Sequence, residues 1–245
     1  MHTAVRSSES SVQSPRPLRW LPLLLAASVA APAAAQVGHP PERSPYRDLE
    51  YTQEWTFFGG YFSPRRDPVG VAPQSGEMYG ARWDLRIGGP AYLYGRMAAA
   101  SLPRRVVDPK QPIGQRFVGT VTLPLLFTDA GFGINLTGFK TWHGLAPELL
   151  LGGGTTADLK GRADIGKYQF GIPFTMTFGG AVKWVPTGRW QVRADWSNYL
   201  YQIRYPESYF LRVGTDDPVL LPGAVHSHWY RNSALQLGLS YLYHR

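Results

Sequence analysis

A His-Ser-His run at His226, Ser227 and His228 holds the residue types of an activated serine nucleophile, and Asp216 and Asp217 precede it in the same polar stretch. Together they could form a Ser–His–acid set that hydrolyses or transfers an acyl group. A serine flanked by histidines in a polar loop is common, however, so these five residues are weak candidates and the sequence predicts no catalytic site. The two histidines lack a third ligand fixed by spacing, so neither a metal site nor a cofactor is expected.

A second group of charged residues alternates with apolar ones at a spacing of two, as on one face of a β-strand. If the strands closed into a small barrel, this face would point inward, where side chains fill the interior. Buried charges must be paired, and both signs occur at the right parity. The sequence therefore predicts a lumen charge network that plugs the barrel. Its members are Arg82, Asp84, Arg86, Arg96, Arg193 and Asp195.

A third group consists of arginines in predicted loops: Arg65, Arg66, Arg104 and Arg105. The planar guanidinium fork matches phosphate geometry, so these residues are candidates for contact with the phosphate groups of outer-leaflet lipids. The simpler alternative is a set of solvated loop charges.

The strands that must position these groups have their clearest sequence pattern at the C-terminus, over 235–245. Leu235, Leu237, Leu239, Tyr241 and Tyr243 share one parity, and small or polar residues take the other, apart from Leu242. A membrane barrel turns such an apolar face to lipid and ends it in interfacial aromatics. The aromatic residues predicted at the membrane interface are Trp55, Trp83, Trp184, Trp190, Trp196, Tyr241 and Tyr243.

The same alternation recurs along the chain and predicts eight strands. They span about 54–62, 77–87, 91–99, 116–137, 146–156, 168–184, 190–204 and 235–245. Connections alternate between long and short, as in outer-membrane barrels with brief periplasmic turns and longer external loops. Over 116–137 the apolar residues change from odd-numbered to even-numbered positions. A change of face within one strand predicts a β-bulge, placed near Asp129–Gly131.

Composition and the N-terminus agree with export. Arg16 and Arg19 precede the apolar run 21–31, and Ala33–Ala35 offers a cleavage pattern, so residues 1–35 are predicted to be a signal peptide. Residues 36–53 are expected to be a periplasmic lead-in and 54–245 the barrel. The 245-residue chain has no cysteine, which excludes disulfides and thiolate metal sites. Its net charge of +8 is spread without a basic patch, so no nucleic acid partner is expected.

The chain resembles the small eight-stranded outer-membrane barrels related to OmpA and OmpX. The resemblance rests on the first hairpin at 59–66, the turn at 141–147 and the C-terminal strand. It implies an antiparallel up-and-down barrel whose C-terminal strand is read by the outer-membrane assembly machinery. Family members usually end on an aromatic residue, whereas here His244 and Arg245 follow Tyr243.

The prediction is an all-β, eight-stranded antiparallel transmembrane barrel of the bacterial outer membrane, exported by a cleaved signal peptide. Its expected function is non-enzymatic: envelope structure, with a plugged lumen and external loops presented for interaction, and lipids as neighbours. One alternative is an outer-membrane lipid acyltransferase or deacylase that uses the histidine-rich run. Another is a soluble lipocalin-like barrel that binds a small apolar ligand.

Overall fold

A computed structural model describes residues 44–186, 188–221 and 223–244, and its regular structure is β apart from two short 3-10 turns. The elements are β1 (Tyr46–Asp48), β2 (Gln53–Ser63), β3 (Gly76–Gly88), β4 (Ala91–Val107), η3 (Ile113–Gln115), β5 (Phe117–Asn135), β6 (Lys140–Trp142), β7 (Leu145–Asp158), β8 (Phe174–Trp184), β9 (Trp190–Arg204), η4 (Glu207–Phe210) and β10 (Ser227–His244). The predicted signal peptide 1–35 lies outside the described residues, as does the lead-in up to residue 43.

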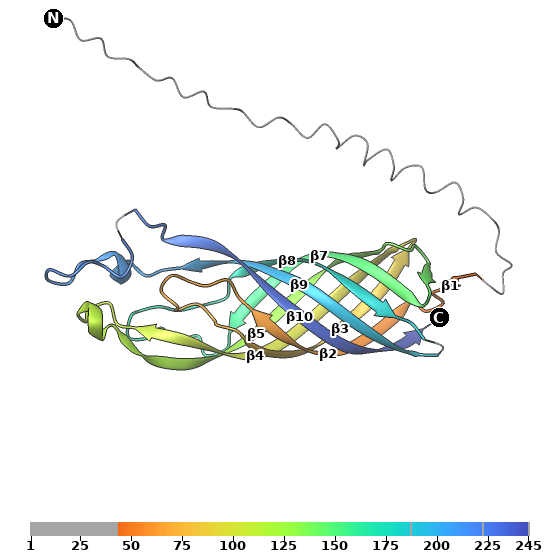
Figure 1. Cartoon of the computed structure of the whole chain (residues 1–245), viewed down its shortest axis with the longest axis horizontal. Coiled ribbons are helices and arrows are strands. Elements are labelled where there is room, and N and C mark those ends of the chain that lie inside the picture. The colour runs from red at the N-terminus through yellow and green to blue at the C-terminus, as the bar shows by residue number, and fades with distance from the viewer. Residues whose placement is uncertain (1–43, 187, 222, 245) are drawn as a thin grey trace, which may run out of the picture. The chain divides into compact units, whose positions relative to one another are not determined.

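Eight of the strands form a closed antiparallel ring (Figure 1). Going around it, the order is β2-β3-β4-β5-β7-β8-β9-β10, and β10 pairs again with β2. Leu239 lies opposite Phe57 in that last ladder, while Pro147 lies opposite Val182 where β7 meets β8. A closed ring leaves no open sheet edge around the wall. The predicted eight-stranded antiparallel up-and-down barrel is confirmed.

The connections divide the barrel into two ends. At the turn end, β3 and β4 are joined by Gly89 and Pro90, and Gly89 takes the left-handed φ of 56° that this tight turn requires. The C-terminus and β1 lie at this end as well (Figure 1). At the loop end lie the connections 64–75, 108–116, 159–173 and 205–226. The predicted alternation of long and short connections is therefore present, except that the turn-end connection 136–144, which contains β6, is as long as 108–116.

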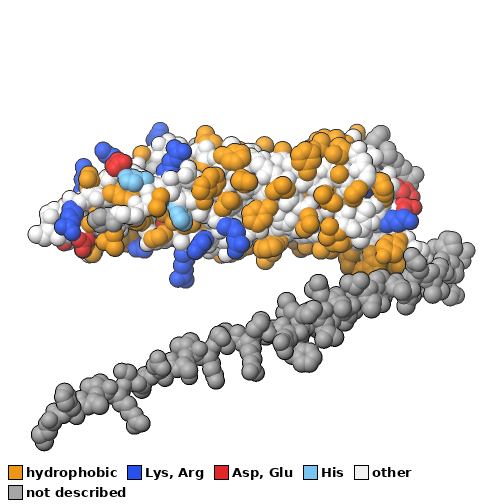
Figure 2. All heavy atoms as spheres, turned by 90° about the horizontal axis from the view of Figure 1, so that it is seen from above, with side chains coloured by type: hydrophobic (Ala, Val, Ile, Leu, Met, Phe, Trp, Pro, Cys, Tyr) orange, Lys and Arg blue, Asp and Glu red, His pale blue; other side chains and the backbone are white. Residues whose placement is uncertain are grey.

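The outer wall is apolar because one parity of each strand carries hydrophobic side chains. On β10, Leu235 and Leu237 are 66% and 63% exposed, whereas Gln236 and Ser240 between and beyond them are buried. Figure 2 shows hydrophobic side chains spread over the barrel wall, with many lysines and arginines gathered toward the loop end. No helix among the described residues is long and apolar enough to cross a membrane.

The predicted β-bulge at Asp129–Gly131 is wrong. Both ladders of β5 run through these residues without a register shift. The parity of the apolar residues changes because Leu125 and Phe127 point inward and are buried, while Phe132 and Ile134 point outward and are exposed. The side chains of β5 therefore alternate between the two faces along the whole strand. The apolar residues change position because the residues that line the lumen become apolar toward the loop end.

Element bounds differ most from the prediction at four elements: β8, β4, β10 and β1. β8 begins at Phe174 and not at residue 168, since Gly171 has a φ of 72° and Pro173 has no N–H to donate. β4 continues to Val107 and β10 begins at Ser227, so both extend further toward the loops than expected. Within the predicted lead-in, Tyr46–Asp48 forms β1, which pairs with β6 at the turn end.

Candidate functional site

The barrel lumen holds a buried cluster of charged side chains toward the turn end. We call it the lumen charge cluster; it consists of Glu54, Arg82, Asp84, Arg96, Asp129, Glu148, Lys183, Arg193 and Asp195, all buried. Each comes from the inward parity of its strand, and together they represent seven of the eight barrel strands. The described part of the lumen is therefore lined by charges of both signs.

Most of the cluster forms one continuous chain of ion pairs. Lys183 bridges Glu54 (2.6 Å) and Glu148 (3.0 Å), while Arg193 Nη1 lies 2.8 Å from Glu148. Arg193 Nε also donates to Asp195 at 2.8 Å. The chain ends at Arg82, which lies 3.6 Å from Asp195 and donates to Asp84 at 2.6 Å. Because each charge has an opposite neighbour, the desolvation cost of burial is offset in part; Arg82 Nη1 and both Nη atoms of Arg193 are buried without a hydrogen-bond partner among the described residues.

A second pair lies further toward the middle of the lumen. Arg96 donates to both carboxylate oxygens of Asp129, at 2.9 and 3.0 Å, in the two-bond geometry that a guanidinium fork favours. Arg96 also donates to Ser197 (2.7 Å), and Thr177 donates to Asp129 (3.0 Å). These bonds tie β4, β5, β8 and β9 together across the interior.

Tyrosine rings pack against the cations of the cluster. The Arg82 guanidinium lies 4.3 Å from the ring centre of Tyr94, and the Tyr92 hydroxyl donates to Glu148 at 2.6 Å. Tyr94 needs a glycine opposite it, because a Cβ at Gly152 would lie 2.3 Å from its hydroxyl oxygen. A cavity of about 50 Å³ remains at the turn end, between Leu49, Arg86 and Lys183. That volume holds a few waters at most.

Beyond the charges, the lumen holds an apolar layer toward the loop end. Its central rings are Phe62 from β2, Phe127 from β5 and Tyr199 from β9, each at most 1% exposed. Their ring centres are 5.4 Å (Phe62 to Phe127) and 5.2 Å (Phe127 to Tyr199) apart. Met78 and Leu125 pack in the same cluster. These rings enter the lumen from three different strands.

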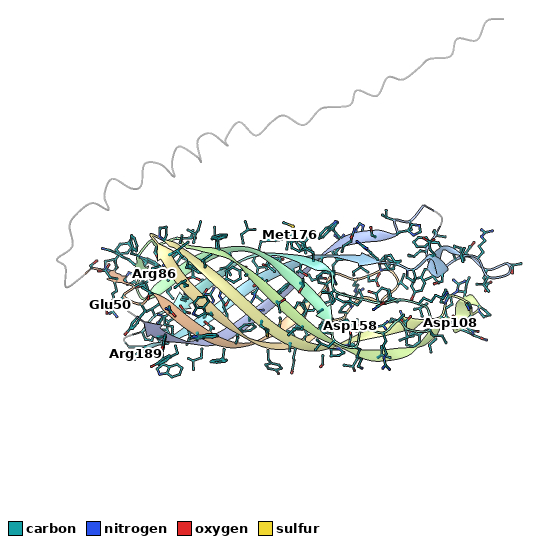
Figure 3. All side chains as sticks on the ribbon, turned by 180° about the vertical axis from the view of Figure 1, so that it is seen from behind. Glu50, Arg86, Asp108, Asp158, Met176 and Arg189 are labelled. Atoms are coloured by element: carbon teal, nitrogen blue, oxygen red, sulfur yellow. The ribbon has the colours of Figure 1, made fainter. Side chains whose placement is uncertain are left out.

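The structure brings together five of the six residues that the sequence proposed for the lumen: Arg82, Asp84, Arg96, Arg193 and Asp195. The sixth, Arg86, is half-buried at the turn end and donates to the carbonyl of Leu49 instead of joining the chain of ion pairs. Figure 3 shows Arg86 at this rim, with Glu50 and Arg189 near the same end.

Four members of the cluster were not singled out from the sequence: Glu54, Asp129, Glu148 and Lys183. The parity of Glu54 and Lys183 within their strands was a usable signal, since both alternate with exposed aromatic residues. Asp129 was hidden by the supposed bulge. Glu148 lies in β7, where Leu and Gly residues blur the alternation.

The long loops fold onto one another above the apolar layer. Asp67 accepts hydrogen bonds from the N–H groups of Val69 and Ala72 and from the Tyr205 hydroxyl, which joins loop 64–75 to loop 205–226. Arg104 pairs with Asp164 at 2.7 Å and so joins β4 to loop 159–173. Burial, together with the hydrogen bond to Asp67, raises the pKa of Tyr205. Tyr205 therefore stays neutral as a donor at physiological pH.

The weak catalytic candidates are not brought together. Ser227 accepts a hydrogen bond from Gln202 (2.9 Å), and His226 stacks on Phe210. Among the described residues, no hydrogen bond joins Ser227 to either neighbouring histidine. Asp216 accepts from the N–H of Ile113, Asp217 pairs with Arg212, and the His228 ring packs on Tyr230. No group of three His, Asp or Glu residues in the described part of the chain is arranged to hold a metal.

Of the four loop arginines, one does not lie where the sequence placed it. Arg104 is 5% exposed and paired with Asp164, so it faces inward and is not available to lipid; this corrects the prediction. The reason is that β4 extends to Val107, which gives Arg104 the inward parity of the strand. Arg65, Arg66 and Arg105 are exposed.

The predicted interface aromatics lie mainly at the turn end of the outer wall. Trp55 contacts Trp83 (6.5 Å between ring centres), and Trp190 contacts Tyr241 (5.1 Å). Trp184 and Tyr243 are exposed on strands that end there. Trp196 is exposed too, but it lies further along β9, beside Leu235.

No protein-family model matches the sequence, and no curated protein matches it. Several solved structures are similar in fold. The N-terminal β-barrel domain of Pseudomonas aeruginosa OprF matches 78% of this chain and 98% of its own length, with 12% identity and a TM-score of 0.41. Neisserial surface protein A matches 82% and 98%, with 13% identity and a TM-score of 0.38. The outer membrane protein Ail of Yersinia pestis matches 78% and 99%, with 11% identity and a TM-score of 0.36. The likeness is to small outer-membrane barrels and is one of fold alone.

Proposed function

We propose that this chain is a non-enzymatic β-barrel of the bacterial outer membrane, with a filled lumen and an interlocked set of external loops. One observation carries the proposal: the polarity of the barrel wall is inverted relative to a soluble protein. Leu235, Leu237 and Phe57 are exposed on the outside, while Arg82 and Arg193 are buried inside. A soluble barrel would expose a large apolar surface to water, whereas in a bilayer the same surface faces lipid.

Backbone hydrogen bonding supports the same environment. In hydrocarbon every backbone N–H and C=O must find a partner within the protein, and only helices and closed barrels achieve this. Here each barrel strand pairs on both sides and the ring closes through β7 and β8. The loop end, with the longer connections, is assigned to the outside, and the turn end with its aromatic residues to the periplasmic interface.

The lumen supports a structural role over a transport role. The chain of ion pairs around Arg193 and Lys183 fills the part of the lumen toward the turn end. The rings of Phe62, Phe127 and Tyr199 close the part toward the loop end. The loops pack into a cap held by Asp67–Tyr205 and Arg104–Asp164. Such a barrel would contribute to the envelope and present a fixed external surface for interaction. The exported chain would be inserted by the assembly machinery through β10.

The proposal is tested by gel mobility of the membrane-extracted protein, unboiled against boiled, with membrane fractionation alongside. We expect a faster unboiled band and recovery in the outer-membrane fraction, because a closed barrel resists unfolding by detergent until it is heated. Soluble recovery without a mobility shift would contradict the proposal and favour the lipocalin-like alternative.

A filled lumen predicts that the purified protein does not conduct ions. In planar bilayers we expect no steady conductance steps from the native protein, because the inward side chains of an eight-stranded barrel fill its interior and here they form ion pairs and packed aromatic rings. A wide outer-membrane porin in the same bilayers is the positive control. Reproducible single-channel steps from the native protein would contradict a filled lumen while leaving the membrane location untouched.

A further inference from the structure

A cleft of about 450 Å³ opens at the loop end between loop 64–75 and β4. Three arginines line it, Arg65 and Arg66 from the loop and Arg105 from the strand, together with Asp67 and backbone of the same loop. Each of the three is exposed. We propose that this cleft binds a phosphate group of an outer-leaflet lipid; the lipid source of the phosphate rests on the proposed membrane location.

The position of Arg105 is fixed by its surroundings. Its guanidinium carbon lies 4.5 Å from the ring centre of Phe117. Its aliphatic part lies against Gly70, where a Cβ would come within 2.8 Å of Arg105 Cδ, and Gly70 itself has a left-handed φ of 78°. The N–H of Arg105 donates to the carbonyl of Gly70 at 3.0 Å. A guanidinium held in this way loses less side-chain entropy when it binds an anion.

The loop that carries the other two arginines is held in place as well. The Asp67 carboxylate accepts from the N–H of Val69 (3.3 Å) and Ala72 (2.9 Å) and from the Tyr205 hydroxyl. The N–H of Arg65 donates to the side chain of Asn232 on β10 at 3.3 Å. Asp67 is thus occupied in shaping the loop, and its charge is satisfied by donors other than the arginines.

The positive charge of the cleft is not neutralised by ion pairs. Within the described part of the chain, no carboxylate forms an ion pair with Arg65, Arg66 or Arg105 at 4 Å or less. Arg104, the neighbour of Arg105, shows the contrast because it is buried and paired with Asp164. Three arginines without an ion pair line one cleft, and this concentration of positive charge favours a multiply charged oxyanion such as phosphate.

The depth of the cleft favours a lipid as the source of that phosphate. Tyr61 on β2 and Tyr79 on β3 are the last outward aromatic side chains before the loop, 52% and 60% exposed. Aromatic side chains of this kind lie at the boundary between hydrocarbon and headgroups. Arg65 follows Tyr61 by four residues and lies two residues beyond the end of β2 at Ser63, so at most about 14 Å of extended chain separates the two. That distance places the cleft at the level of lipid headgroups.

The experiment measures binding of a short-chain phosphatidic acid to the full-length native protein in neutral detergent micelles by titration calorimetry. We expect saturable binding by the native protein. The variant Arg65→Gln/Arg66→Gln/Arg105→Gln should bind at least about tenfold more weakly, because it loses charge-assisted hydrogen bonds. A control with the same charge change at exposed arginines away from the cleft, Arg47→Gln/Arg162→Gln/Arg189→Gln, should bind as the native protein does.

Two further arms decide the remaining outcomes. The single variant Arg66→Gln, at an exposed loop position, tests the site if the triple variant does not fold; native-like binding by Arg66→Gln would then overturn the proposal. Inorganic phosphate is titrated in parallel, and binding as tight as that of the lipid would overturn the lipid source. Absence of lipid binding by a native protein that still shows the heat-dependent gel shift would overturn the cleft alone, whereas absence of that shift would count against the membrane location itself.

Discussion

Replacing Arg193 with methionine is expected to lower the free energy of unfolding by up to about 3–5 kcal/mol, because removing this buried cation leaves Glu148 and Asp195 only partly compensated. Arg193 is fully buried and lies against both Glu148 and Asp195. Methionine fills similar volume but carries no charge, so both carboxylates lose a cation. Lys183 and Arg82 remain as their other cationic neighbours.

The measurement is a guanidinium titration of the barrel in phospholipid vesicles, followed by tryptophan fluorescence. The matched control is Arg212→Met, which removes an arginine from the exposed pair with Asp217. Exposed pairs contribute at most about 1 kcal/mol, so the control should unfold nearly as the native protein does. Equal, small effects of the two substitutions would mean that the lumen charges are hydrated and that the lumen is not filled.

Introducing a charge on the outer wall is expected to have the second largest effect. Leu237 lies on β10 between Gly59 and Ala194, and it is 63% exposed. In water, Leu237→Arg would be nearly neutral, as most surface substitutions are. On the lipid face of a barrel, arginine costs about 2–4 kcal/mol near the bilayer midplane. We expect that loss in the same titration, with less folded barrel recovered from the outer membrane.

Leu221→Arg is the matched control, because Leu221 is 65% exposed but lies in loop 205–226. The two substitutions are chemically identical at leucines of nearly equal exposure. Only the environment of the wall separates them. If both variants were as stable as the native protein, the outer face of β10 would be in contact with water and the membrane proposal would be wrong.

Much of the fold was predictable because strand alternation and connection length are local properties of a chain. The residues of β10 alternate with a period of two whatever they pair with, so their outward and inward faces could be assigned from the sequence. The same reasoning assigned Arg82, Asp84, Arg193 and Asp195 to the lumen. It failed at β5, where Leu125 and Phe127 are apolar but face inward. The polarity of a side chain indicates whether it faces outward or into the lumen only where it is known whether that part of the lumen is polar or apolar.

The loop arginines show the same limit. Arg104 and Arg105 are adjacent and chemically identical, and the sequence treats them alike. The structure separates them because β4 extends through both, so that Arg104 faces inward to Asp164 and Arg105 faces outward to the cleft. The end of a strand depends on whether its neighbour continues, and here β5 pairs with β4 up to Val107. The alternation of residues within 91–107 alone does not show how far the neighbouring strand continues.

By itself, the sequence determined the class of fold, the number of barrel strands and the face that most side chains take, since these follow from local periodicity and turn chemistry. The tertiary structure decided which inward residues meet. Lys183 lies between Glu54 and Glu148, which come from strands far apart in the chain, because strand tilt and stagger set the level of each side chain in the lumen. The separation of charges toward the turn end from aromatic side chains toward the loop end is likewise a result of closing the strands into a barrel.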